Sequence, residues 1–154
     1  ALREDPDIIL VGELRDLDTM RLALSAAETG HLVLCTLHTS SAAKTVDRIV
    51  DVFPGPEKSL VRGMLAESLQ AVISQVLLKR EGGGRIAARE ILWCTPAIRN
   101  LIREDKTAQM YSALQTGTQH GMQTLDQALK QLLAQRLVSR EEAKAKARMP
   151  EGFG

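Results

Sequence analysis

Aromatic residues are scarce in this sequence, and long apolar segments are absent. Only 3% of its 154 residues are Phe, Trp or Tyr, so a stacking surface for single-stranded nucleic acid is not expected. Lysine and arginine together number 20, and aspartate and glutamate 19. This balance argues against nucleic-acid binding through bulk positive charge. No apolar run approaches the roughly 20 residues of a membrane-spanning helix, so we predict a globular protein with no nucleic-acid partner and no membrane span.

Cysteine is also rare. Cys35 and Cys94 are the two cysteines, and they lie far apart in the sequence without forming a CxxC pair. A zinc ribbon, a redox motif and a disulfide framework are therefore not expected, and a reducing cytosol is the default environment. The chain opens at Ala1 without a signal peptide, and we interpret it as a fragment of a longer protein.

Several catalytic motifs are missing. No glycine is followed by lysine, so the chain lacks the Gly-Lys-Ser/Thr of a P-loop. The Gly82–Gly84 run is no substitute, because a strand rather than a helix is expected after it. No GxSxG nucleophile elbow occurs, and the three histidines lack metal-ligand spacing.

The first half of the chain has an α/β pattern. Ile8–Val11 is a short apolar run that predicts a strand buried on both faces, which is typical of a parallel sheet covered by helices. Asp16 is the expected N-cap of a helix that ends at Gly30, and His31–Thr39 predicts a second strand. Two helices should follow, because apolar residues there keep helical spacing. These residues are Val46, Ile49, Val50 and Phe53, and then Val61, Met64, Leu65, Leu69, Val72, Ile73 and Val76.

The pattern then changes. Leu77–Arg80 and Arg85–Trp93 flank the run of three glycines and predict an antiparallel hairpin. The remaining residues read as helices. We therefore expect two domains: residues 1–94 as part of an α/β core, and residues 95–154 as a small all-helical subdomain.

Glu13 is the first candidate for chemistry. It follows the strand Ile8–Val11 after a single glycine, and ligands in open α/β sheets bind beyond the carboxyl ends of the strands. A carboxylate there could hold a magnesium-bound water or orient an attacking water in phosphoanhydride hydrolysis. The alternative is an ordinary exposed glutamate after a core strand, since four apolar residues followed by an acid are common.

His38 is the second candidate. It lies at the far end of the second strand, and would share an edge with Glu13 if the two strands are parallel. His31 begins the same strand and would lie at the opposite edge, where residues usually serve stability. A structural role for His38 is the alternative.

The third candidate is the segment Ala97–Glu104. Its apolar residues Ile98, Leu101 and Ile102 fall on one helical face. Arg99 and Arg103 are four residues apart and share a face, which costs a few tenths of a kcal/mol. The surface of a partner could offset that cost. Alternatively the helix is simply solvated, with Glu104 nearby.

Taken in order, these segments resemble the secretion ATPase superfamily and, within it, the type IV pilus retraction ATPases. Residues 5–16 are similar to the Walker B region, with Gly12 where most P-loop proteins have Asp. Residues 31–33 and 36–39 are similar to the His box. The string AIRNLIRE resembles a motif associated with the retraction branch. Its residues are Ala97, Ile98, Arg99, Asn100, Leu101, Ile102, Arg103 and Glu104.

The branch is indicated by cysteine content. Extension and type II secretion ATPases typically carry a four-cysteine zinc module, and two cysteines cannot form one. The accessory paralogue of the retraction ATPase is the remaining alternative, and the intact AIRNLIRE string favours the retraction ATPase itself.

The resemblance implies the C-terminal part of a RecA-like P-loop ATPase core, with parallel strands, helices and a hairpin, followed by a helical subdomain. It implies a hexameric motor that hydrolyses ATP with Mg²⁺, acts on an inner-membrane pilus platform protein, and is cytoplasmic and peripheral at that membrane. Without a P-loop, this chain alone is expected to be inactive. An alternative is that it serves only ring assembly and signalling.

The resemblance also implies residue roles. Glu13 would serve Mg²⁺, through a water, and the attacking water, and His38 would contact the γ-phosphate. Arg15 and Thr39 are weaker candidates at the nucleotide or a neighbouring subunit. The AIRNLIRE helix would transmit the nucleotide state to retraction. How the role of base divides between Glu13 and an acid upstream of this chain stays open.

Overall fold

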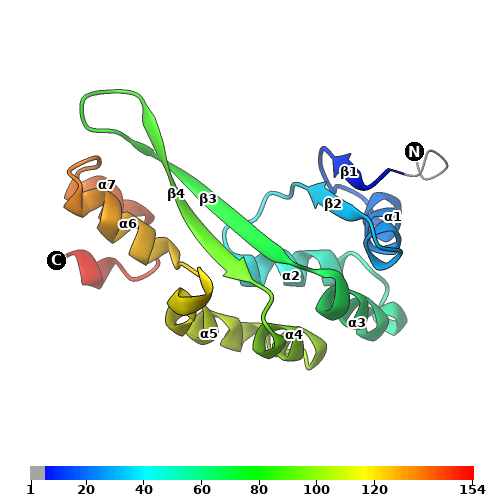
Figure 1. The fold of residues 1–154 in the computed structure, drawn as a ribbon. Coiled ribbons are helices and arrows are strands. Elements are labelled where there is room, and N and C mark those ends of the chain that lie inside the picture. The colour runs from blue at the N-terminus through cyan, green and yellow to red at the C-terminus, as the bar shows by residue number, and fades with distance from the viewer. Residues whose placement is uncertain (1–5) are drawn as a thin grey trace. The chain divides into compact units, whose positions relative to one another are not determined.

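The structure is a computed structural model that describes residues 6–154. Asp5, at the start of the segment similar to Walker B, lies outside the described residues. The chain forms two compact units (Figure 1). The first contains the described residues up to Thr39, together with Ala43–Gln70 and Cys94–Met110. The second contains Ser40–Ala42, Ala71–Trp93 and Tyr111–Gly154.

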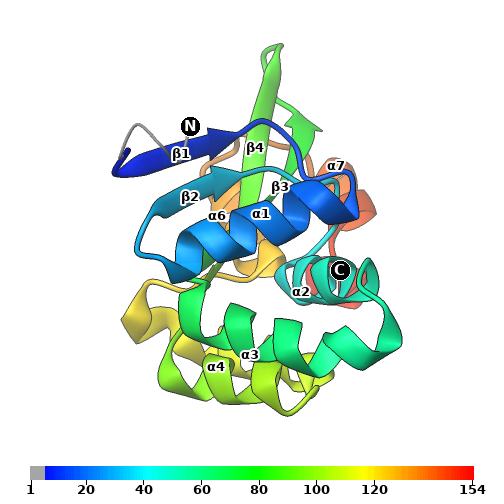
Figure 2. The same ribbon diagram turned by 90° about the vertical axis from the view of Figure 1, so that its right-hand side faces the viewer.

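The first unit opens with two parallel strands joined by a helix. Strands β1 (Ile8–Val11) and β2 (Leu32–Cys35) pair in register from Ile8 opposite Leu32 to Val11 opposite Cys35. Helix α1 (Leu17–Glu28) connects them and lies along the pair in Figure 2. The predicted N-cap is confirmed, because the Asp16 carboxylate accepts a hydrogen bond from the Thr19 amide at 2.8 Å. The β1–α1–β2 order and the parallel pairing are those expected of an α/β fold.

Two details of these strands differ from prediction. The second strand ends at Cys35 rather than Thr39, and beyond it the regular ladder gives way to a single backbone bond from the Leu14 amide to the Thr36 carbonyl. Burial on both faces is also wrong for this chain. Leu10 is 76% exposed and Ile8 59%, since helix α1 can cover only one face of a two-stranded pair.

The other helices of the first unit follow. The helix α2 (Ala42–Asp51), whose residues from Ala43 onward belong to this unit, precedes the 3₁₀ turn η2 (Gly55–Glu57). Helices α3 (Lys58–Ser68) and α4 (Pro96–Arg103) and the turn η3 (Thr107–Gln109) complete it. The predicted apolar stripe is confirmed as buried: Val46, Ile49 and Val50 in α2, and Phe53 just after it. From α3 and α4, the buried apolar residues are Val61, Leu65, Ala66, Ile98 and Ile102.

The second unit is built on a hairpin. Strands β3 (Ala71–Lys79) and β4 (Arg85–Trp93) pair antiparallel along their whole length. The three glycines of the turn have φ values of 83°, 106° and 78°, a region that residues with a Cβ rarely adopt. The hairpin is thus confirmed, but β3 begins at Ala71, where the sequence predicted helix. Over this short window the β-branched Val72, Ile73 and Val76 fit the spacing of a helix as well as that of a strand. The segment forms a strand because it pairs with the nine residues of β4.

Helices α6 (Leu125–Ala134) and α7 (Arg140–Lys146) cover one face of this hairpin. The unit also contains α5 (Met110–Thr116) from Tyr111 onward and the 3₁₀ turns η4 (Gly117–His120) and η5 (Pro150–Phe153). The core shared with the strands consists of Leu78, Ala88, Ala128, Leu129, Val138, Ala143 and Phe153. The other face of the hairpin leaves Ile73 and Leu77 exposed.

The compact units do not coincide with the two predicted segments. Within the first unit α4 packs on α3, and within the second the hairpin packs on α6 and α7. As a division into domains, 1–94 and 95–154 stay a prediction. In the part of the chain that is described, no helix combines the length and apolar character that crossing a membrane requires.

Candidate functional site

The first candidate site lies at the carboxyl edge of the parallel pair. Because β1 and β2 run the same way, the residues that follow them meet at one edge. The Leu14 amide donates to the Thr36 carbonyl at 2.9 Å, and the Thr36 hydroxyl donates to the Gly12 carbonyl. These bonds extend the contact between the two segments past the last ladder pair, and so fix the backbone on both sides of Glu13.

This backbone brings Glu13 and His38 together. The Glu13 Oε1 lies 3.3 Å from Nε2 of His38, and its Oε2 lies 2.7 Å from Nη2 of Arg15. The Glu13 side chain is 25% exposed, whereas that of His38 is 88% exposed. At this edge the Glu13 carboxylate is therefore held by two ion-pair contacts, and its partner His38 is exposed to solvent.

The charge of Glu13 is stabilised locally. The hydrogen bond from Arg15 holds the pKa of the Glu13 carboxyl below its usual value, and the charges of Arg15 and His38 act in the same direction against partial desolvation. The same bond raises the pKa of Arg15. A carboxylate with a lowered pKa is a poor proton acceptor at neutral pH. Glu13 is thus better suited to orienting a water or a hydrated cation than to removing a proton.

The two weaker candidates, Thr39 and Arg15, each have a partner within the chain. The Thr39 hydroxyl lies 2.6 Å from the hydroxyl of Thr45 in α2, so it is engaged away from Glu13. Arg15 is held on Glu13 with its side chain 76% exposed. His31, at the other end of β2, has its Nδ1 at 2.9 Å from the Ala26 carbonyl near the end of α1. That contact agrees with the structural role expected for His31.

The fit to a magnesium ion can be tested from the donor set. Among residues 6–154 no three His, Cys, Asp or Glu side chains come together as a metal site would require. Glu13 offers one carboxylate. That suits Mg²⁺, which keeps several waters and is bound through one or two carboxylates together with substrate phosphates.

The AIRNLIRE segment forms α4 as the sequence predicts. Thr95 is its N-cap, and Pro96 occupies the first turn, where its missing N–H costs nothing. Ile98 and Ile102 are fully buried and Leu101 is half-buried. The exposed residues of the motif are Ala97, Asn100, Arg103 and Glu104.

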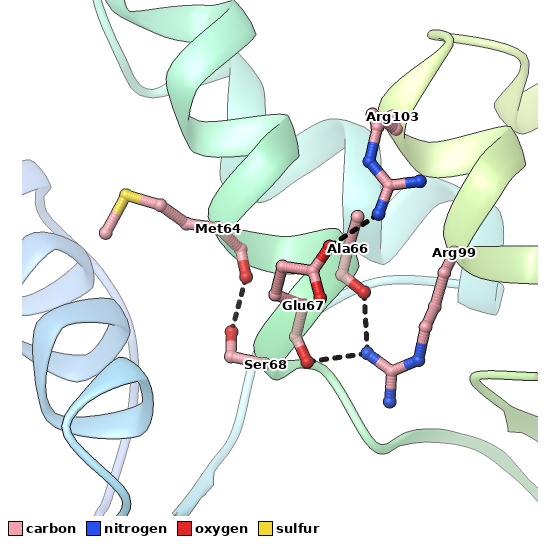
Figure 3. Close-up of polar contacts among 6 residues, drawn as sticks. All are labelled: Met64, Ala66, Glu67, Ser68, Arg99 and Arg103. Atoms are coloured by element: carbon pink, nitrogen blue, oxygen red, sulfur yellow. Dashed lines mark hydrogen bonds and ion pairs between the residues drawn. The ribbon is translucent and has the colours of Figure 1, made fainter. Parts of the chain in front are cut away.

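The two arginines of the motif bind to α3 (Figure 3). Arg99 Nη1 donates to the carbonyl oxygens of Ala66 at 2.6 Å and Glu67 at 2.7 Å. Arg103 Nη2 lies 2.5 Å from the Glu67 carboxylate. The repulsion expected between the arginines is therefore offset inside the chain. Sequence reasoning missed Glu67, since no local signal pairs residues more than thirty positions apart.

Comparison with known proteins now defines the class. Residues 1–145 match the family model described as "Type II/IV secretion system protein", and the chain belongs to this family. An α/β fold with parallel strands, a hairpin and helices is confirmed by a solved structure described as the "Pilus Retraction Motor PilT and Bound ADP". The two superpose with a TM-score of 0.88 at 50% identity, over 98% of this chain and 42% of that one.

The particular similarity is to retraction ATPases. Over 153 residues the chain is 72% identical to the "Type IV pilus retractation ATPase PilT" of Pseudomonas aeruginosa, covering 99% of this chain and 44% of that protein. Identity to the "Type IV pilus ATPase PilU" of the same organism is 40%, over 96% of this chain and 39% of that protein. The chain thus spans less than half the length of these relatives, and it is more similar to PilT than to PilU.

Proposed function

We propose that the protein containing this chain is an ATP-hydrolysing motor of type IV pilus retraction, which powers twitching motility as a ring of six identical subunits. The observation that carries the proposal is the pairing of Glu13 with His38 at one sheet edge, in a chain 72% identical to a PilT. The lower sequence identity to PilU, 40% against 72% to PilT, supports the retraction ATPase over its accessory paralogue.

The geometry suggests how the edge would act. In hydrolysis a water attacks the γ-phosphorus, the bond to the β-phosphate oxygen breaks, and ADP and phosphate leave. Glu13, charged at neutral pH, would accept a hydrogen bond from that water or from a water of the cation. The exposed His38 would donate to a γ-phosphate oxygen. When bound, Mg²⁺ would neutralise phosphate charge, with Glu13 as the residue of this chain that holds it through water.

The P-loop that would bind the phosphates is not part of this chain, which has no Gly-Lys pair. A second candidate function follows for the chain taken alone, namely ring assembly and signalling without catalysis. We also propose that the whole protein is cytoplasmic and peripheral at the inner membrane, and that it meets a pilus platform protein there. The AIRNLIRE helix α4 would transmit the nucleotide state to that partner.

The test is Glu13→Gln in the full-length protein. This change removes charge but little shape, so ATP binding should persist while turnover falls by about 10²–10³-fold, as loss of one preorganised electrostatic contact implies. Turnover and nucleotide affinity would be measured side by side.

The matched control is Glu28→Gln, at an exposed position at the end of α1. It should leave both quantities unchanged. Turnover by Glu13→Gln near the unmodified rate would show that Glu13 has no part in catalysis.

A further inference from the structure

The C-terminal end of α3 depends on a side chain from α4. The last four carbonyls of an α-helix have no partner within the helix, and in α3 they belong to Leu65, Ala66, Glu67 and Ser68. The Leu65 carbonyl accepts from the Leu69 amide at 2.9 Å. The Ser68 carbonyl accepts from the side-chain amide of Gln70 at 3.3 Å.

The two remaining carbonyls are bound by Arg99. One nitrogen of the guanidinium, Nη1, reaches both Ala66 and Glu67, while Nη2 lies 3.4 Å from Oε1 of Gln70. A cation at this end of a helix also interacts favourably with the helix dipole. The arginine thus completes the hydrogen bonding of α3 at the point where it ends.

Arg103 adds a second attachment one turn further along α4. Its ion pair with the Glu67 carboxylate joins the end of α4 to the same turn of α3 that Arg99 contacts. The side chains of Arg103 and Glu67 are 48% and 71% exposed, so this pair contributes less than the contacts of the half-buried Arg99. Figure 3 shows both arginines directed from α4 toward one turn of α3.

We propose that Arg99 is a positioning residue that clamps α4 to the C-terminal turn of α3, with Arg103 and Glu67 as a weaker second attachment. The arginines of AIRNLIRE then act inside the subunit. The exposed residues of the motif left for contact with a partner are Ala97, Asn100 and Glu104, of which Asn100 donates to Glu104 at 2.9 Å and Glu104 also pairs with Lys106. This last step rests on the proposed function, because it assumes that α4 signals retraction.

Cys94 provides a reporter for the clamp. Its side chain is 8% exposed, its amide donates to the Gln70 carbonyl at 2.9 Å, and Arg99 is near enough to influence its thiol. Loosening of α4 from α3 should therefore expose this thiol. With Cys35, and any cysteine outside residues 1–154, replaced by Ser, the rate of reaction with an aromatic disulfide reagent reports on Cys94 alone.

The decisive variant is Arg99→Lys in the full-length protein, measured without nucleotide. Lysine keeps the positive charge near the thiol but lacks the planar fork that reaches two carbonyls and Gln70. We expect labelling of Cys94 to become about tenfold faster, as loss of charged hydrogen bonds implies. Arg103→Lys should label close to wild type, because a point charge can still pair with Glu67. Arg48→Ala, an exposed arginine of α2, is the matched control and should not change the rate.

Labelling of Arg99→Lys at the wild-type rate would overturn the proposal, since charge alone would then suffice. If Arg99→Lys does not fold, hydrogen exchange at the Arg99 guanidinium in the wild type decides. Its Nη1 protons should exchange slowly because they are bound to two carbonyls, and exchange as fast as that of the exposed Arg48 guanidinium would refute the clamp. Neither measurement needs ATP turnover, so both stand apart from the proposed function.

The signalling step is tested separately. Arg99→Lys should retain ATP turnover and lose pilus retraction in cells. If turnover and retraction fall in proportion, the clamp supports the ATP site and its link to retraction is wrong. If the wild type neither hydrolyses ATP nor supports retraction, the proposed function fails while the labelling result stands.

Discussion

Replacing Ile98 with Ala tests whether α4 is packed as the structure describes. The Ile98 side chain is 0% exposed, so the change deletes three buried carbon atoms. At about 0.8 kcal/mol for each buried methylene, the lost transfer free energy is about 2.4 kcal/mol. The cavity left behind adds to this, and we expect a total near 3 kcal/mol, inside the range of about 2–5 kcal/mol known for such substitutions.

The assay is urea unfolding followed by circular dichroism. With a slope of about 2 kcal/mol per molar urea, a loss of 3 kcal/mol lowers the midpoint by about 1.5 M. Leu60→Ala is the matched control, because Leu60 belongs to α3 but is 66% exposed. It should cost less than about 0.5 kcal/mol. An Ile98→Ala protein within 1 kcal/mol of the wild type, or a Leu60→Ala protein equally destabilised, would refute the packing of α4.

Two further predictions concern the chain itself. Purified residues 1–154 should show no appreciable ATP turnover, because they lack a Gly-Lys pair; robust Mg²⁺-dependent hydrolysis in a phosphate-release assay would contradict this. Burial raises the pKa of Cys94 to about 11 despite the opposing charge of Arg99. Because only the thiolate reacts, labelling of Cys94 should be slow at neutral pH. In a stopped-flow titration the labelling rate should increase toward pH 11. Because this pKa is raised in the fold, its contribution to stability is present below the ordinary thiol pKa and is lost as the pH rises through the folded value. A labelling profile centred at the ordinary thiol pKa would show that Cys94 is not buried.

Local sequence signals were sufficient for several elements. The Asp16 cap, the α2 stripe and the glycine turn depend on residues within a few positions of one another, and each is found where its pattern predicts. The shared edge of Glu13 and His38 follows in the same way, because strand direction and two strand ends place both residues. Their chemical roles stay predictions.

Other features depend on contacts between distant residues. The segment around Val72 satisfies helical spacing, and only pairing with β4 makes it a strand. The exposure of Leu10 could not be foreseen, since an apolar run does not say how many neighbours cover it.

Sequence alone thus determined the order of strands and helices, the edge that carries Glu13 and the amphipathic character of α4. Only the tertiary structure decided what the polar face of α4 meets. Spacing showed that Arg99 and Arg103 share a face, but their partners are two carbonyls and a carboxylate on α3. Backbone carbonyls carry no side-chain signature, and the turn that leaves them without partners exists only because α3 ends at Ser68.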